Sequence, residues 1–224
     1  MKSYGQFCSV ARALELLGER WTLLVVRELL CGSRTFGDVR RGIPRISRTM
    51  LSARLRELRD AGLVLRGEDA TYALTAAGQE LAGVVRELGT WGQRWLPREL
   101  GHDVLDVDAL IWDIRRRVNR DALPAVPVVA RLETSDARGR ASVRYLLLRR
   151  SEVSLCAANP GFPEQLRIRA PLRTLTGWWR GDLSLAQARA QGLLVEGRRE
   201  WVRAIPRWFE RYLFAAVAPV STGR

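Results

Sequence analysis

Apolar residues recur every three or four positions through the first part of the chain, which predicts a series of helices. Residues 8–17 have this spacing, whereas residues 20–31 are apolar almost throughout, as in a buried central helix with Trp21 as an anchor. Thr35 is placed to N-cap a third, short helix. Gly42 then ends it, and Pro44 disfavours helix at the residue before it, so a turn must follow.

A second predicted helix, over residues 47–61, follows this turn. Ser47 is its N-cap, and Gly62 stands just beyond its end, where a C-cap glycine belongs. Steps of four and three residues bring three leucines into one narrow arc that we expect to be buried, namely Leu51, Leu55 and Leu58. The opposite face carries mainly small or polar residues flanked by arginines. The two helices and the turn between them therefore predict a helix-turn-helix.

Two short alternating segments, Leu63–Arg66 and Thr71–Leu74, surround the turn-rich residues 67–70 and predict a hairpin. A hairpin in this position is the wing of a winged helix-turn-helix. Because the wing tip is acidic, we expect Arg66, Thr71 or backbone amides to contact DNA rather than the tip itself.

The order of these elements predicts that helix 47–61 enters a major groove while the arginines reach phosphates. A solvated amphipathic helix would carry similar charges, and only the surrounding elements favour DNA binding. The predicted DNA-binding residues are Arg45, Ser47, Arg48, Thr49, Ser52, Ala53, Arg56, Arg59, Arg66 and Thr71.

A long helix is predicted over residues 76–95, and Pro97 ends it. Its apolar stripe is wider than a small helical domain can cover, which is typical of a subunit interface. The stripe consists of Leu81, Val84, Val85, Leu88, Trp91 and Trp95.

The pattern changes after a linker at 97–103. A helix over about 104–118 precedes segments with strand character, and helices return toward the end. The expected strands are Val128–Leu132, Ser142–Leu148, Val153–Ala157 and 165–170, and the expected helices are one after Pro171, one over 185–190 and one over 198–213. The chain is thus α+β, with a DNA-binding domain over 1–96 and a second domain over 104–224.

Charge supports a polyanionic partner, either nucleic acid or an acidic membrane surface, since the formal net charge is +13. Nine arginines against three acids give +6 over residues 34–66. A general solubility role for the positive surface is the alternative. All cations but Lys2 are arginines, whose planar groups suit phosphate or guanine contacts.

Three cysteines without CxxC spacing predict neither a disulfide framework nor a metal site. With no leader-like start and no long apolar run, we expect a soluble, cytoplasmic protein without a membrane partner. His102 is the single histidine and lies in the linker, so histidine-based catalysis is unavailable. No nucleotide-binding glycine motif is present. We therefore expect that the protein is not an enzyme and that it binds no cofactor.

Residues 8–95 resemble the DNA-binding domain of HxlR-type transcriptional regulators, within the winged-helix class that includes MarR proteins. The resemblance rests on motifs such as LGERWTL (17–23), FGD (36–38), ISRTML (46–51) and YALT (72–75). It implies a homodimer built from terminal helices that binds a palindromic operator on double-stranded DNA. Some members use the cysteine that matches Cys8 as a redox sensor; a plain core thiol is the alternative here.

The second domain resembles the sterol-carrier-protein-like domain fused to some HxlR-type regulators, on the segments NPGF (159–162), WRGDLS (179–184) and GLLVEG (192–197). That resemblance implies a small sheet whose helices enclose an apolar tunnel, and hence control by a small apolar effector. Pocket candidates are Trp112, Leu175, Trp178 and Trp179, which could equally be plain core residues. A lipid or small-molecule carrier whose helical domain mediates association is the alternative function.

Overall fold

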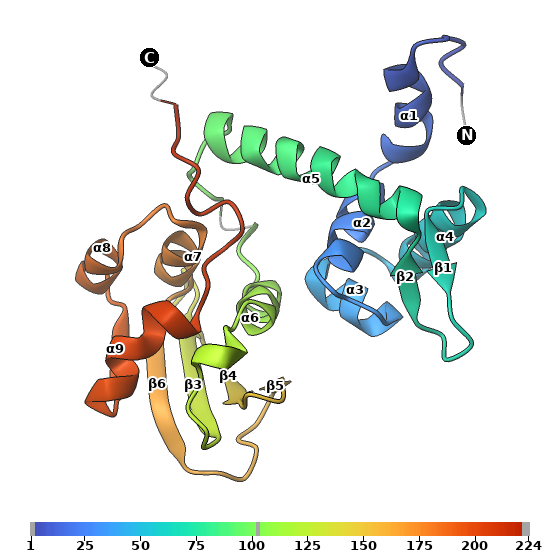
Figure 1. The fold of residues 1–224 in the computed structure, drawn as a ribbon. Coiled ribbons are helices and arrows are strands. Elements are labelled where there is room, and N and C mark those ends of the chain that lie inside the picture. The colour runs from blue at the N-terminus through green and yellow to red at the C-terminus, as the bar shows by residue number, and fades with distance from the viewer. Residues whose placement is uncertain (1–2, 102–103, 221–224) are drawn as a thin grey trace. The chain divides into compact units, whose positions relative to one another are not determined.

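The computed structural model describes residues 3–101 and 104–220. Contacts divide the chain into two compact units, Met1–Gly89 and Thr90–Arg224, which Figure 1 shows with their helices and strands. The division falls inside helix α5 (Ala76–Trp95), so the last turns of this helix belong to the C-terminal unit. The expected domain end at residue 96 lies a few residues beyond this point. His102 lies outside the described residues.

The N-terminal unit contains the predicted helices and hairpin in the predicted order. Before α5, these are α1 (Ser9–Leu17), α2 (Thr22–Leu30), α3 (Phe36–Gly42), α4 (Arg48–Asp60), β1 (Val64–Arg66) and β2 (Tyr72–Leu74). The hairpin is antiparallel and pairs Val64 with Leu74 and Arg66 with Tyr72. The periodicity of the sequence therefore predicts the helices and the hairpin of this unit correctly.

The core of the N-terminal unit forms where α2, α3 and α4 meet β1. Its buried residues are Val25, Val26, Leu29, Val39, Ile43, Ile46, Leu51, Leu55, Leu58 and Val64. The predicted leucine seam of α4 is confirmed. Trp21, expected as an anchor, is only half-buried at the edge of this core, with a left-handed φ of 80° at the start of α2.

The C-terminal unit is a five-stranded sheet with helices packed against it. Its helices are α6 (Val107–Arg116), α7 (Leu172–Arg180), α8 (Leu185–Ala190) and α9 (Arg199–Trp208), with a short 3-10 turn at Arg120–Ala122. Its strands are β3 (Val128–Ser135), β4 (Ala141–Leu148), β5 (Val153–Cys156), β6 (Glu164–Pro171) and β7 (Leu194–Gly197). The strand order is β5-β4-β3-β6-β7, and only the β3–β6 pair is parallel.

The structure corrects two sequence-based helix boundaries and adds one strand. Helix α6 begins at Val107, because the Asp106 carboxylate caps it by accepting the Ala109 N–H at 2.9 Å. Helix α9 ends at Trp208 rather than at residue 213, since Phe209 leaves the helix and forms a bridge with Val118. Strand β7 was not predicted. It is a mostly exposed edge strand, defined by its pairing with β6 rather than by its own pattern.

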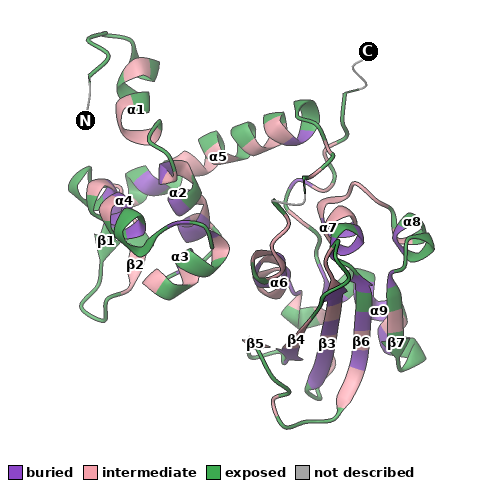
Figure 2. Cartoon of the chain, turned by 180° about the vertical axis from the view of Figure 1, so that it is seen from behind, coloured by how far each residue is buried: buried purple, intermediate pink, exposed green. Residues whose placement is uncertain are grey.

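Buried residues of the C-terminal unit lie on strands β3, β4 and β6 and on the helix sides that face them, coloured purple in Figure 2. Four tryptophans contribute to this core. Trp178 and Trp179 lie with ring centroids 6.4 Å apart, and Trp201 and Trp208 lie 6.2 Å apart. The unit thus buries its largest side chains between sheet and helices.

Candidate nucleic-acid interface

Helices α3 and α4 are held in place by caps that the sequence predicts. The Thr35 hydroxyl accepts the Asp38 N–H at 3.1 Å, and the Asp38 carboxylate accepts the Thr35 N–H at 3.2 Å. The Ser47 hydroxyl accepts the Met50 N–H at 3.1 Å at the start of α4. Each cap satisfies backbone donors that the helix leaves free, so both helix starts are well defined.

A buried carboxylate joins α2 to the end of α3. Glu28 has no exposed surface, and its oxygens accept hydrogen bonds from Ser33 Oγ at 3.1 Å and Arg27 Nη2 at 2.6 Å. A Cβ added to Gly42 would lie 1.9 Å from Glu28 Oε2. Gly42 therefore ends α3 and also makes room for this carboxylate.

The outer face of α4 is open to solvent, as the sequence predicts. Arg48, Thr49, Ser52, Arg56 and Arg59 are exposed, together with Arg45 and Ser47 in the preceding turn, while Ala53 is half-buried. Met50 is also exposed at the amino end of α4 and was not among the predicted contacts.

Arg54 differs from the other arginines of α4, because it points inward. Its Nη2 lies 3.0 Å from Glu19 Oε2, its Nη1 pairs with Glu57, and its Nε donates to the Arg20 carbonyl at 3.0 Å. The arginine is thus a buried tie between α4 and the turn before α2. Its charge is offset by the two glutamates, of which Glu57 is already counted in the +6 of this segment.

Helix α4 and the wing together form a polar groove of about 440 Å³. Four of the predicted DNA-binding residues line it, namely Ser52, Arg56, Arg59 and Arg66. Phe36, Leu55 and Tyr72 contribute apolar surface to it. The hairpin therefore brings Arg66 next to arginines that lie seven and ten positions before it on α4.

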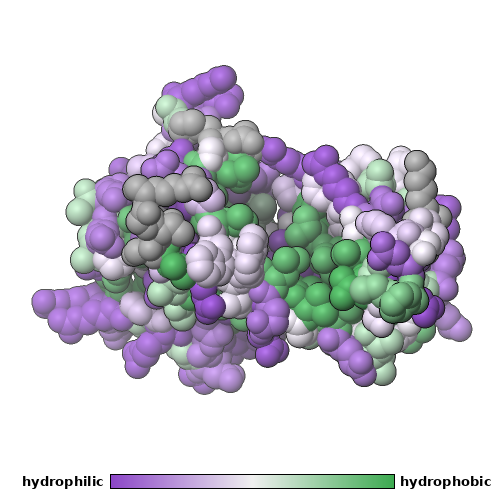
Figure 3. Space-filling view, turned by 90° about the horizontal axis from the view of Figure 1, so that it is seen from above, coloured by the Kyte–Doolittle hydropathy of each residue, from purple (hydrophilic) through white to green (hydrophobic). Residues whose placement is uncertain are grey.

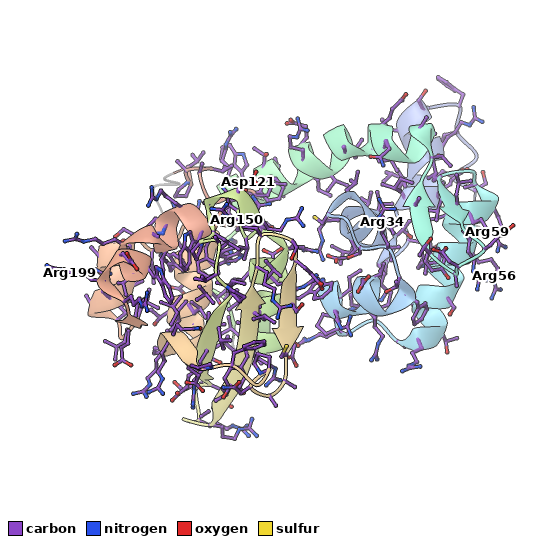
Figure 4. All side chains as sticks on the ribbon, turned by 60° about the horizontal axis from the view of Figure 1, so that its bottom comes forward. Arg34, Arg56, Arg59, Asp121, Arg150 and Arg199 are labelled. Atoms are coloured by element: carbon purple, nitrogen blue, oxygen red, sulfur yellow. The ribbon has the colours of Figure 1, made fainter. Side chains whose placement is uncertain are left out.

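Not all of these arginines carry a free charge. Arg59 pairs with Asp60 at 3.1 Å on the exposed surface. Arg45, Arg48, Arg56 and Arg66 form no ion pair with another described residue. Figure 4 shows the Arg56 and Arg59 side chains extending outward from α4. Uncompensated positive charge is thus present on α4, on the turn before it and on the first wing strand.

At the wing tip, Thr71 is held by Asp69. The carboxylate accepts the Thr71 hydroxyl at 2.6 Å and the Thr71 N–H at 3.1 Å. These two bonds lower the pKa of Asp69. Thr71 is half-buried and does not line the groove, so among the predicted wing contacts Arg66 is the better placed.

Cys8 lies immediately before α1 and is exposed rather than part of a core. The backbone N–H groups of Ala11 and Val10, at the start of this helix, lower the pKa of its thiol. Backbone donors at a helix start favour a thiolate in this way.

The pocket candidates of the C-terminal unit are all buried. Leu175, Trp178 and Trp179 belong to its main core, and the Trp179 indole N–H donates to Asp113 Oδ2 at 2.7 Å. Trp112 lies outside that core, with the Arg115 guanidinium 4.7 Å from its ring. None of these four residues lines the groove at α4. None of them lines a separate hollow of about 590 Å³ in the C-terminal unit either.

Within residues 3–101 and 104–220, no cluster of three His, Cys, Asp or Glu side chains could hold a metal ion. Over the same ranges, no helix has the length and apolar character needed to cross a membrane.

Comparison with known proteins gives matches to DNA-binding regulators. Residues 16–100 match the family model described as HxlR-like helix-turn-helix. The HTH-type transcriptional regulator YvaP of Bacillus subtilis is 34% identical over 91 residues, which cover 38% of this chain and 84% of YvaP.

An HTH-type transcriptional regulator of Mycobacterium tuberculosis is 46% identical over 99 residues. The match covers 42% of this chain and 62% of that relative, so the chain spans less than two thirds of the mycobacterial protein. Among solved structures, quinone-bound YodB from B. subtilis is 36% identical with a TM-score of 0.36, and the match covers 38% of this chain and 97% of YodB.

Proposed function

The chain belongs to the HxlR-like helix-turn-helix family of transcriptional regulators, and from this we propose that it binds double-stranded DNA as a homodimer. Helix α4 of each protomer enters a major groove, and the wing lies beside it. Two identical helices in a symmetric dimer match a palindromic operator.

One observation carries the DNA-binding proposal: the open face of α4 and the wing groove hold exposed arginines without acidic partners among the described residues. Arg56 and Ser52 line the groove, while Arg48 and Thr49 lie at the amino end of α4, where recognition helices contact base edges. Arg45, Ser47, Ala53, Arg59, Arg66 and Thr71 complete the proposed contact surface.

Exposed apolar residues on α1 and α5 support the dimer. On α1, Val10 and Leu14 are exposed, and α1 has no buried residue. On α5, Val84, Leu88, Trp91 and Trp95 are about half exposed. Figure 3 shows apolar side chains gathered on one face of the molecule. Such side chains favour burial against a second copy of the chain.

The C-terminal unit is proposed as the effector domain. Its separate core and its sheet covered by helices support the sterol-carrier-protein-like assignment. A ligand in this unit acts only if it prefers one arrangement of the dimer over another.

The test is a binding assay on DNA from the promoter of its own operon, at several salt concentrations. Arg56→Ala and Arg48→Ala should each weaken binding by about 1–3 kcal/mol if they contact bases. Arg203→Ala, an exposed arginine on α9, is the matched control and should have no effect. Binding that is insensitive to salt and sequence would overturn the proposal. Unchanged DNA affinity in both α4 variants would show that the surface that contacts DNA bases lies elsewhere.

A further inference from the structure

A hollow of the C-terminal unit lies where strands β3 and β6 end. Ser135 of β3 and Pro171 of β6 are register partners at the ends of these two parallel strands. The hollow measures about 590 Å³, a volume typical of small-molecule sites. It is lined by the β3–β4 turn, by the first residues of α7 and by Leu105. The carboxyl ends of parallel strands are a frequent location of ligand sites in sheets with parallel strands.

The charge of the hollow is positive. Arg138, Arg140 and Arg173 line it, against the single acid Asp136. The Asp136 carboxylate is already used, since it accepts the Arg140 Nε–H and the Arg138 N–H at 2.9 and 2.8 Å. Within the described part of the chain, Arg138 and Arg173 form no ion pair. Two cations are thus available to a ligand.

Helix α7 adds to this positive field. The hollow contains its first two residues, Leu172 and Arg173, and the helix has neither a side-chain cap nor an acidic residue in its first turn. The free N–H groups of a helix start favour a bound anion, and the Arg173 guanidinium adds positive charge at the same place.

The remaining lining is apolar. Leu105, Ala137, Pro171 and Leu172 supply this surface, and Leu172 belongs to the main core. A ligand that fits both parts carries a negative head group and a short apolar portion.

We propose that this hollow is the effector site, and that it binds a small amphipathic organic anion of the medium-chain carboxylate type. The inference rests on the proposed function, in which the C-terminal unit is the effector domain. It moves the site away from Trp112, Leu175, Trp178 and Trp179 and changes the ligand class from purely apolar to anionic.

The other end of α7 connects this site to α5. The Gln93 Nε2 amide donates to the Arg180 carbonyl at 3.2 Å, and Arg180 Nη2 donates to the Gln93 side-chain oxygen at 3.3 Å. Asp182, just after α7, pairs with Arg98. A ligand at the start of α7 thus binds one end of a helix whose other end is hydrogen-bonded to the last turns of α5.

The test is calorimetric titration of the full chain with three probes: octanoate, octan-1-ol and inorganic phosphate. Octanoate should bind, and both other probes should bind at least about tenfold more weakly. Equal binding of phosphate would show a simple anion site, and equal binding of octan-1-ol would show a purely apolar one. Either result overturns the proposal.

Two variants locate the site. Arg138→Gln with Arg173→Gln should weaken octanoate binding by about tenfold or more, because charge-assisted contacts are lost. Arg189→Gln with Arg199→Gln removes the same charge from exposed positions on α8 and α9, outside the hollow, and should leave binding unchanged. Equal loss in both pairs would contradict the site.

Ala137→Glu gives an independent check, because it places a carboxylate at an exposed position of the hollow and should also weaken octanoate binding. Unchanged octanoate binding in Ala137→Glu would count against the site. DNA affinity of the same preparations without octanoate separates the two proposals. DNA binding without octanoate binding overturns the effector site alone, whereas octanoate binding without DNA binding overturns the proposed function alone.

Discussion

The arginines on α4 have different roles, although their sequence context is similar. Arg54 is buried and bonded to Glu19, Glu57 and the Arg20 carbonyl, while Arg56 is exposed and unpaired among the described residues. A residue's position around the helix therefore decides whether its charge holds the fold or faces a ligand.

Replacing Arg54 should lower stability rather than act on DNA contacts directly. Arg54→Met keeps most of the volume but removes two ion pairs and a backbone hydrogen bond, at a cost of about 1–3 kcal/mol. Urea unfolding followed by far-UV circular dichroism measures this. Arg56→Met is the control and should change the free energy of unfolding by less than about 0.5 kcal/mol. Equal destabilisation by both would show that Arg54 is not a structural tie.

The Cys8 thiol should ionise below its ordinary pKa of 9.0, since backbone N–H groups stabilise the thiolate. In a Cys31→Ser, Cys156→Ser background, the alkylation rate by iodoacetamide should rise with pH and reach its midpoint below that value. Unfolding in urea removes the backbone donors, so the midpoint should return upward. Identical midpoints in the two states would remove this support for Cys8 as a proposed redox sensor.

At the scale of elements, local rules predict much of the DNA-binding unit. The Thr35 and Ser47 caps and the seam of Leu51, Leu55 and Leu58 follow from neighbours in sequence, and the structure contains them. Arg54 faces inward because it lies three positions after Leu51 and four before Leu58, but its partner Glu19 is 35 positions away and could not be predicted from local pattern.

In the C-terminal unit, even more of the structure depends on contacts between residues that are distant in sequence. Strand β7 is exposed over most of its length and exists through its pairing with β6. The hollow beside Arg138 and Arg173 forms where β3 and β6 end side by side, and strand pairing of this kind is not readable from periodicity. Of the tryptophans predicted as pocket residues, Trp178 and Trp179 belong to the main core, whereas Trp112 is buried outside it.

Helix α7 should transmit effector binding to α5 through the paired amide of Gln93. Gln93→Ala should leave octanoate affinity and DNA affinity within about twofold of the parent, because it contacts neither ligand. It should reduce the change in DNA affinity that octanoate causes. Gln79→Ala, an exposed residue earlier on α5, is the control and should retain that change in full. A full octanoate response in Gln93→Ala would exclude this route.

For the whole molecule, the expected assembly is a dimer held by apolar surface. Leu88→Glu introduces a charge on the exposed apolar stripe of α5 and should raise the dimer dissociation constant by at least about tenfold, as measured by sedimentation. Gln79→Glu adds the same charge on the side of α5 opposite Leu88 and should leave the dimer intact. Dissociation in both variants, or a monomeric parent, would contradict the proposed interface.

The tryptophan pairs of the C-terminal core have a practical consequence. Five of the eight tryptophans, Trp112, Trp178, Trp179, Trp201 and Trp208, are buried in this unit. Intrinsic fluorescence will therefore report mainly on the melting of the C-terminal unit. A fluorescence denaturation curve will be nearly blind to the helices that carry the DNA-binding residues, and a second optical probe placed on α4 will be needed to follow them.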